Sequence, residues 1–177
     1  PQDIVEQAAI LAEEGYKTLK CKVGRNHQSD LKILDAIRTE VGNITLRVDA
    51  NMGWSSAKEA VRRINELAAF ELELIEQPLH YSDMEGLAFV RSNVQVPIMA
   101  DESVWTPADA MACIRANAVD VFNIYVSEAG GISPAAQIFS IAEAARLPCI
   151  IGSMPELGIG TAAQAHLAFA MHNIGYA

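Results

Sequence analysis

Six short apolar runs that alternate with amphipathic stretches are the feature that most constrains the fold. The runs are rich in β-branched residues and contain few polar ones, which is typical of strands buried on both faces of a parallel sheet. They recur about every 25 residues, the length of a strand, a helix and two short loops. The sequence therefore predicts an α/β chain of six strands and seven helices, the last helix over about 161–171. The runs lie at 18–23, 44–48, 72–75, 97–100, 119–125 and 148–151.

Hydroxyl side chains mark the predicted starts of four helices. Two of them have the spacing of a capping box, with a glutamate three residues after a serine. The other two precede a proline, which is favoured at the first helical position. The four pairs are Ser56 with Glu59, Ser82 with Glu85, Thr106 with Pro107, and Ser133 with Pro134.

The bulk properties exclude several classes of protein. The chain has 177 residues, of which 51% are hydrophobic, and a net charge of −9. Such a charge disfavours binding to nucleic acid or to an anionic membrane. No apolar run reaches the length of a membrane span. The three scattered cysteines, Cys21, Cys113 and Cys149, are expected to be free thiols in the cytoplasm.

Polar residues stand at the carboxyl end of each predicted strand. In a closed parallel barrel these ends surround one mouth, where barrel enzymes hold their active sites. Strands at opposite edges of an open sheet would not converge in this way. The spacing therefore favours a barrel. The residues are Lys22, Asp49, Glu76, Asp101 and Tyr125, at steps of 27, 27, 25 and 24, followed after the last strand by Ser153 and Glu156.

Three carboxylates on successive strands, Asp49, Glu76 and Asp101, form a candidate metal site. An all-oxygen ligand set suits Mg²⁺, with Mn²⁺ as an alternative, and the absence of His or Cys argues against zinc. Each carboxylate alone is as well explained by capping of the following helix. Their regular recurrence beside two lysines favours the metal.

Lys20 and Lys22 lie two residues apart in a predicted strand, so their side chains point to the same side. Inside a barrel, mutual repulsion and partial burial are expected to lower a lysine pKa, and a lysine nearer to neutrality can act as a general base. The alternative is an exposed edge strand, where lysines oppose aggregation.

These motifs, taken together, resemble the muconate-lactonizing branch of the mandelate racemase/muconate lactonizing enzyme family, in the enolase superfamily. The resemblance extends over nearly the whole chain. It implies a TIM-type (β/α) barrel with a separate capping domain. The motifs are Lys20-Cys21-Lys22, Asp49-Ala50-Asn51, Glu76-Gln77-Pro78, Asp101-Glu102-Ser103, Gly130-Gly131-Ile132 and Glu156-Leu157-Gly158-Ile159-Gly160.

The resemblance also implies a reaction. Mg²⁺ held by the three carboxylates would stabilise an enediolate formed when a base removes the proton next to a substrate carboxylate. Lys22 would be that base, and Lys20 would tune it and contact the carboxylate. The product would be that of an isomerase, racemase or cycloisomerase, or of a dehydratase. Glu102 is a further catalytic candidate, and Asn51, Ser153 and Glu156 are substrate-binding candidates.

The chain departs from the family pattern at the fifth strand. Family members usually carry an Asn-Ile-Lys run where this chain has Asn123-Ile124-Tyr125, and Glu128 replaces a second common lysine. A tyrosine, with a reference pKa near ~10, is a poor base but can donate a proton. This favours one-base chemistry, either loss of water or isomerisation from one face. The alternative is that Tyr125 only packs in the mouth.

By this alignment, residues 1–177 are a partial catalytic barrel, from the second strand to the seventh helix. The first strand, the last strand and the capping domain are expected to lie outside it, and this fragment alone is expected to be inactive. The intact protein is expected to be a homo-oligomer that acts on a small-molecule carboxylate. Two other readings stay open: a lyase that uses a Schiff-base lysine, and a catalytically inert barrel remnant.

Overall fold

The computed structural model describes residues 2–176, and its elements confirm the predicted alternation of six strands and seven α-helices. One short 3₁₀ helix, η1, follows α3. Each strand begins and ends within two residues of its predicted run. The elements are α1 (Gln2–Glu13), β1 (Thr18–Lys22), α2 (His27–Val41), β2 (Thr45–Asp49), α3 (Ala57–Leu67), η1 (Ala68–Phe70), β3 (Leu72–Glu76), α4 (Met84–Asn93), β4 (Ile98–Ala100), α5 (Pro107–Ala116), β5 (Val121–Tyr125), α6 (Ile132–Ala144), β6 (Cys149–Gly152) and α7 (Gly158–Ala170).

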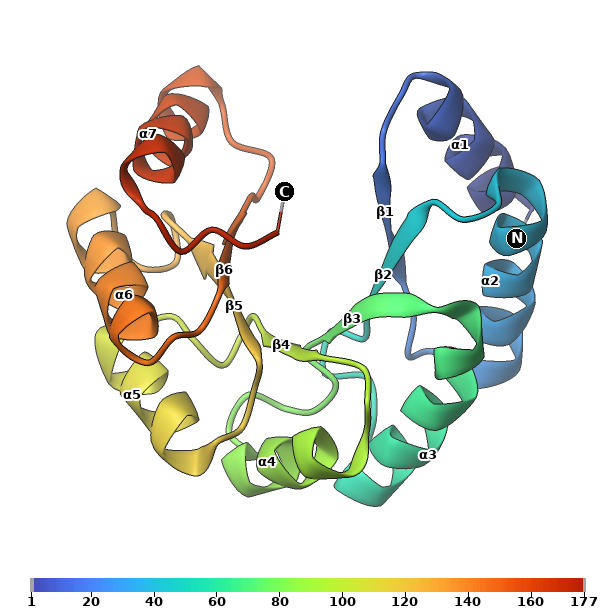
Figure 1. Ribbon diagram of the computed structural model, residues 1–177, viewed down its shortest axis with the longest axis horizontal. Coiled ribbons are helices and arrows are strands. Elements are labelled where there is room, and N and C mark those ends of the chain that lie inside the picture. The colour runs from blue at the N-terminus through green and yellow to red at the C-terminus, as the bar shows by residue number, and fades with distance from the viewer. Residues whose placement is uncertain (1, 177) are drawn as a thin grey trace.

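The six strands form one parallel sheet in the order of the sequence, from β1 to β6. Figure 1 shows the sheet curled into part of a barrel, with the helices on its outer side and an opening between β1 and β6. Within residues 2–176, β1 and β6 are the two edges of the sheet. No helix in this range is long and apolar enough to cross a membrane.

Alternate residues of each strand face different surroundings. The outward residues, such as Leu19 and Cys21 of β1, join one large apolar core between sheet and helices. A small second cluster of Leu74, Met99 and Val121 lies on the inner side. Since alternate side chains of a strand point the same way, the inner side also receives the polar residues near the strand ends.

The register of the strands aligns the polar residues. Lys22 is paired with Asp49, and Asp49 is paired with Glu76. Glu76 is in turn paired with Met99, two residues before Asp101. The carboxyl ends of β1 to β4 therefore lie at one level, which places their polar side chains at a common mouth.

Two of the four predicted helix starts are confirmed. The Ser56 side chain accepts a hydrogen bond from the Glu59 amide at 3.4 Å, although the Glu59 carboxylate bonds to Ser55 rather than back to Ser56. Thr106 caps α5 in a full capping box with Asp109, and Pro107 is the first helical residue.

The other two predicted helix starts are wrong. The α4 cap is Asp83, which accepts a hydrogen bond from the Gly86 amide at 2.9 Å, while the Ser82 hydroxyl is bonded to His80. Helix α6 begins at Ile132, one residue before Ser133. Gly131 precedes it with φ 125°, a conformation that a serine would adopt only with strain.

Candidate active site

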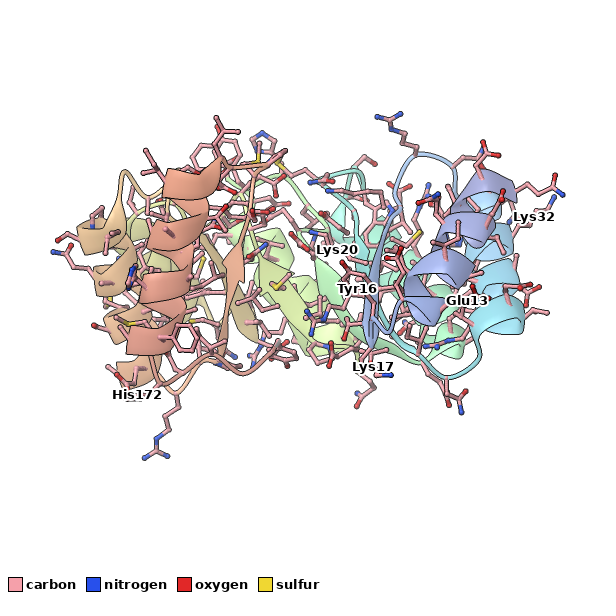
Figure 2. All side chains as sticks on the ribbon, turned by 90° about the horizontal axis from the view of Figure 1, so that it is seen from above. Glu13, Tyr16, Lys17, Lys20, Lys32 and His172 are labelled. Atoms are coloured by element: carbon pink, nitrogen blue, oxygen red, sulfur yellow. The ribbon has the colours of Figure 1, made fainter. Side chains whose placement is uncertain are left out.

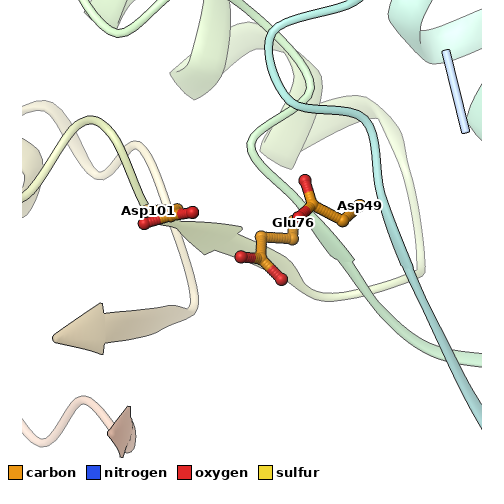
Figure 3. A group of neighbouring side chains, drawn as sticks. All are labelled: Asp49, Glu76 and Asp101. Carbon is orange, nitrogen blue, oxygen red and sulfur yellow. The ribbon is translucent and has the colours of Figure 1, made fainter. Parts of the chain in front are cut away.

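Three buried carboxylates lie together at the ends of β2, β3 and β4. Asp49, Glu76 and Asp101 are 1%, 0% and 7% exposed, and each offers an oxygen within 4.8 Å of the other two. Figure 3 shows Glu76 between the two aspartates. The structure thus brings together the three residues that the sequence singled out as metal ligands.

The electrostatics of this cluster fit a divalent cation. Burial, and then repulsion from Glu76 and Glu102, raises the pKa of Asp101 to about 9. Carboxylates that repel one another this strongly are stabilised by a shared positive charge. Because all three donors are carboxylate oxygens, the residues present fit a hard cation such as Mg²⁺, whose octahedral shell leaves further positions for water or substrate oxygens.

Lys20 reaches the same cluster from the inner side of β1, and Figure 2 shows it near the middle of the molecule. Its Nζ lies 2.7 Å from Glu76 Oε2 and 3.1 Å from Asp49 Oδ2. Burial favours a lower pKa for Lys20, but the contacts with Glu76 and Asp49 outweigh burial, and the pKa is raised. The predicted lowering of a lysine pKa is therefore wrong for Lys20, because its carboxylate partners favour the ammonium form.

Lys22 lies nearer to solvent than Lys20. Its side chain is 64% exposed, against 38% for Lys20, and its Nζ lies 2.6 Å from Asp49 Oδ2. A second hydrogen bond joins Nζ to Asn51 Oδ1. Lys22 is thus accessible from the mouth of the barrel while two neighbours hold its amine.

Asn51 connects Lys22 to Glu102. Its Nδ2 donates a hydrogen bond to Glu102 Oε1 at 3.2 Å, and its backbone amide donates to Asp49 Oδ1 at 2.9 Å. The other Glu102 oxygen, Oε2, is buried and has no hydrogen-bond partner among the described residues. Both ends of the Asn51 amide already have partners within the chain.

Tyr125 stands on the far side of the carboxylates, at the end of β5. Asn123 donates hydrogen bonds to Glu76 Oε1 at 3.0 Å and to the Tyr125 hydroxyl oxygen at 3.4 Å. Burial, and then the charge of Asp101, raises the pKa of Tyr125. The phenol is therefore neutral at ordinary pH. Asn123 was not predicted as a site residue, although its spacing of two from Tyr125 matches that of the lysine pair.

Ser153 and Glu156 follow β6 and bond to each other. The Ser153 hydroxyl donates to Glu156 Oε2, and the Met154 amide donates to Glu156 Oε1 at 3.1 Å. Ser153 also lines a cavity of about 550 Å³ together with Lys20, Glu76 and Tyr125. Of the three predicted substrate-binding residues, Asn51, Ser153 and Glu156, Ser153 alone lines this cavity.

A comparison with family models matches residues 3–177 to the enolase C-terminal domain-like family. The chain belongs to this family. The match agrees with the fold and with the predicted resemblance.

Within the family, the chain is similar to several isomerases. It is 43% identical over 176 residues to a hydrophobic dipeptide epimerase from Enterococcus faecalis, covering 98% of this chain and 49% of that protein. It is 40% identical over 173 residues to an L-Ala-D/L-Glu epimerase from Clostridium acetobutylicum, covering 96% and 48%. A dipeptide epimerase from Cytophaga hutchinsonii, solved with Mg and the dipeptide D-Ala-L-Val, superposes with a TM-score of 0.95 at 33% identity, covering 99% and 48%.

The chain spans about half the length of these relatives. Its six strands are thus part of an enolase-type barrel, and its carboxylates lie at the carboxyl ends of those strands.

Glu128 follows the end of β5 by three residues. Burial, and then the charge of Glu102, raises the pKa of Glu128, while a hydrogen bond from Trp105 acts in the opposite direction. Neither Glu102 nor Glu128 has a salt bridge to a basic residue in the described part of the chain.

Proposed function

We propose that the protein carrying this chain is a magnesium-dependent isomerase that removes the proton next to a substrate carboxylate. One observation carries the proposal: three buried carboxylates face two lysines at the mouth of the barrel. The similarity to epimerases supports it, because epimerisation of an amino acid residue requires removal of its α-proton.

Asp49, Glu76 and Asp101 would hold the Mg²⁺ ion. When bound, the ion would supply positive charge that stabilises the negative charge developing on the substrate carboxylate. Lys20, kept as an ammonium by Glu76 and Asp49, would bind a carboxylate oxygen of the substrate. Together these groups would hold the substrate carboxylate, and the α-carbon of the substrate would then face the mouth of the barrel.

Lys22 would be the base. Its amine is accessible from the mouth and is held by Asp49 and Asn51, so it can approach the α-carbon from the β1 side. A positioned base within hydrogen-bond reach contributes typically about 10²–10⁴-fold to such a step. Glu102 would accept a hydrogen bond from Asn51 and so help to hold Asn51 against Lys22.

Tyr125 would be the acid on the opposite side. Its raised pKa keeps the proton on the phenol, and Asn123 orients the hydroxyl towards the carboxylate cluster. Removal of a proton by Lys22 and return of a proton from Tyr125 would invert the α-carbon.

The substrates that we propose are dipeptides, because the relatives named above act on dipeptides. The reacting carbon would then belong to the residue with the free carboxylate. Ser153 would contact the substrate from the β6 side of the cavity. Glu156 would hold the Ser153 hydroxyl in place.

Loss of a β-hydroxyl as water is a second candidate reaction. It needs one base and one acid, and a neutral Tyr125 suits the role of the acid. A Schiff-base mechanism has less support, since it gives no role to the three clustered carboxylates.

The test is a panel of dipeptides incubated with the full-length protein in D₂O with Mg²⁺, with α-proton exchange followed by NMR. We expect exchange at the C-terminal residue of at least one dipeptide, and its loss when EDTA removes the metal. Appearance of a 2-oxo acid from 2,3-dihydroxy acids, without exchange in any dipeptide, would favour dehydration. Exchange that is indifferent to EDTA would contradict the proposal.

A further inference from the structure

Gln77 follows Glu76 directly and is fully buried, with 0% of its surface exposed. Its backbone φ is 35°, in the left-handed region that a residue with a side chain rarely adopts. A strained residue of this kind persists only where its surroundings hold it in place, and such residues cluster at functional sites. The contacts of Gln77 show what holds it.

The backbone of Gln77 joins β3 to both neighbouring strand ends. Its amide donates to the Met99 carbonyl at 2.9 Å, in β4. Its carbonyl accepts from the Met52 amide at 2.8 Å, three residues after Asp49. The chain segments around two of the three carboxylates are thus fixed to Gln77 by its main chain.

The side chain of Gln77 makes further contacts with the segment that contains Asp101. Its Oε1 accepts hydrogen bonds from the Asp101 amide at 2.9 Å and the Ser103 amide at 3.2 Å. Its Nε2 donates to the Leu79 carbonyl and to Ser103 Oγ, each at 2.8 Å. Every polar group of Gln77 therefore has a partner, and most of these partners lie in the chain around Asp49 and Asp101.

We propose that Gln77 is the positioning residue of the divalent cation site. It ties together the three strand ends that carry Asp49, Glu76 and Asp101, and so sets the distances among their carboxylates. The inference rests on the proposed function, since it assumes that these carboxylates hold Mg²⁺. Groups that orient metal ligands typically change metal affinity by about 10–100-fold when they are removed.

A merely structural role for Gln77 predicts a different result. In that case its loss would lower the stability of the barrel without changing the affinity of folded protein for Mg²⁺. Mg²⁺ affinity measured on folded protein separates the two roles, because only a positioning role predicts a change in that affinity.

The experiment is isothermal titration of Mg²⁺ into metal-free, full-length protein, with the melting temperature of each variant recorded. Gln77→Met keeps the size of the side chain and removes its hydrogen bonds. Gln77→Glu restores an oxygen acceptor for the amides of Asp101 and Ser103. Leu87→Ala, a fully buried position on α4, is the control for loss of stability.

We expect the Mg²⁺ dissociation constant to rise about 10-fold or more in Gln77→Met. It should rise less in Gln77→Glu and stay within about twofold of wild type in Leu87→Ala. If Gln77→Met does not fold, Ser103→Ala takes its place with a smaller expected rise of about threefold, because it removes one of the two acceptors of Nε2.

Equal dissociation constants in wild type and in the folded Gln77 and Ser103 variants would overturn the inference and leave the proposed function standing. A wild-type protein that binds no Mg²⁺ would overturn both.

Discussion

The two sides of the barrel mouth carry opposite kinds of polar group. On the β1–β3 side, Lys20 and Lys22 form ion pairs with Asp49 and Glu76. On the β4–β6 side, Glu102 and Glu128 have no salt bridge to a basic residue in the described chain. Tyr125, on the same side, is neutral.

This difference indicates a division of labour in proton transfer. In the proposed mechanism, Lys22 would accept a proton on one side of the carboxylate cluster, and Tyr125 keeps its proton on the other side. The family match does not by itself require such an asymmetry. The asymmetry follows from Tyr125. Burial raises the pKa of its phenol, so the phenol keeps its proton and is a poor base.

Removal of the metal should have the largest effect, because both sides act on a substrate that the cation holds. Chelation of the full-length protein should lower α-proton exchange by more than about 10³-fold, since the metal contributes several kcal/mol of charge stabilisation. Adding back Mg²⁺ should restore the rate, which NMR in D₂O would measure. Full exchange in the presence of EDTA would show that the reaction does not need the cation.

Lys22→Ala should have the next largest effect, because it removes the acceptor on the β1 side. We expect exchange in the full-length protein to fall by at least about 10², the scale of general-base catalysis. Lys32→Ala is the matched control, since Lys32 lies exposed on the outer helix α2 (Figure 2). An unchanged rate in Lys22→Ala would show that another group is the base.

Tyr125→Phe should slow formation of the inverted product by about 10-fold or more while removal of the first proton continues. Exchange without inversion would then accumulate, and chiral separation of the product would measure it. Tyr81→Phe, at an exposed tyrosine that does not line the cavity, is the control. If Tyr125→Phe inverts substrate at the wild-type rate, Tyr125 only packs in the mouth.

The stability of the metal-free protein should fall as pH rises. The pKa of Asp101 is raised to about 9 in the folded state from an ordinary value of 3.8, so the folded state binds the proton more tightly than the unfolded state. This stabilisation is fully present below the unfolded pKa and is lost as pH approaches 9. Each kcal/mol lost lowers the melting temperature by roughly 2–4 °C.

Differential scanning calorimetry between pH 6 and pH 9 would measure this slope. Asp101→Asn should flatten it, and saturating Mg²⁺ should do the same, because the cation takes the place of the proton. A slope that Asp101→Asn leaves unchanged would mean that other groups cause it.

Ser153→Ala should have the smallest effect. The Ser153 hydroxyl borders the cavity but lies outside the ion-paired cluster, so we expect KM to rise by about threefold with little change in kcat, the scale of one neutral hydrogen bond. Ser140→Ala on α6 is the control, because its hydroxyl donates to the Ala136 carbonyl of the same helix, away from the cavity. A large fall in kcat would give Ser153 a part in proton transfer.

The sequence predicted those features that depend on spacing along one chain segment. The recurrence of polar residues about every 25 positions sufficed to predict the strand ends and the meeting of Asp49, Glu76 and Asp101. The cap at Thr106 was also predicted correctly, because the hydroxyl and Pro107 are adjacent.

Features that depend on partners from distant strands were not predictable. Lys20 was expected to have a lowered pKa, but its main partner, Glu76, is 56 residues away, and a local pattern does not show that contact. Gln77 received no role for the same reason, since its side chain bonds to Asp101 and Ser103. The start of α6 was missed because the positive φ of Gly131, and not Ser133, determines where that helix begins.

The most direct test of the asymmetric site compares α-proton exchange from two dipeptides that differ only at the reacting carbon, such as L-Ala-L-Glu and L-Ala-D-Glu. The full-length wild-type protein and the Lys22→Ala and Tyr125→Phe variants would be followed by NMR in D₂O with Mg²⁺. The account predicts that wild type exchanges one of the two at least about 10-fold faster, and that Lys22→Ala abolishes this exchange. Comparable exchange from both dipeptides, lost for one in Lys22→Ala and for the other in Tyr125→Phe, would contradict it and make Tyr125 a second base.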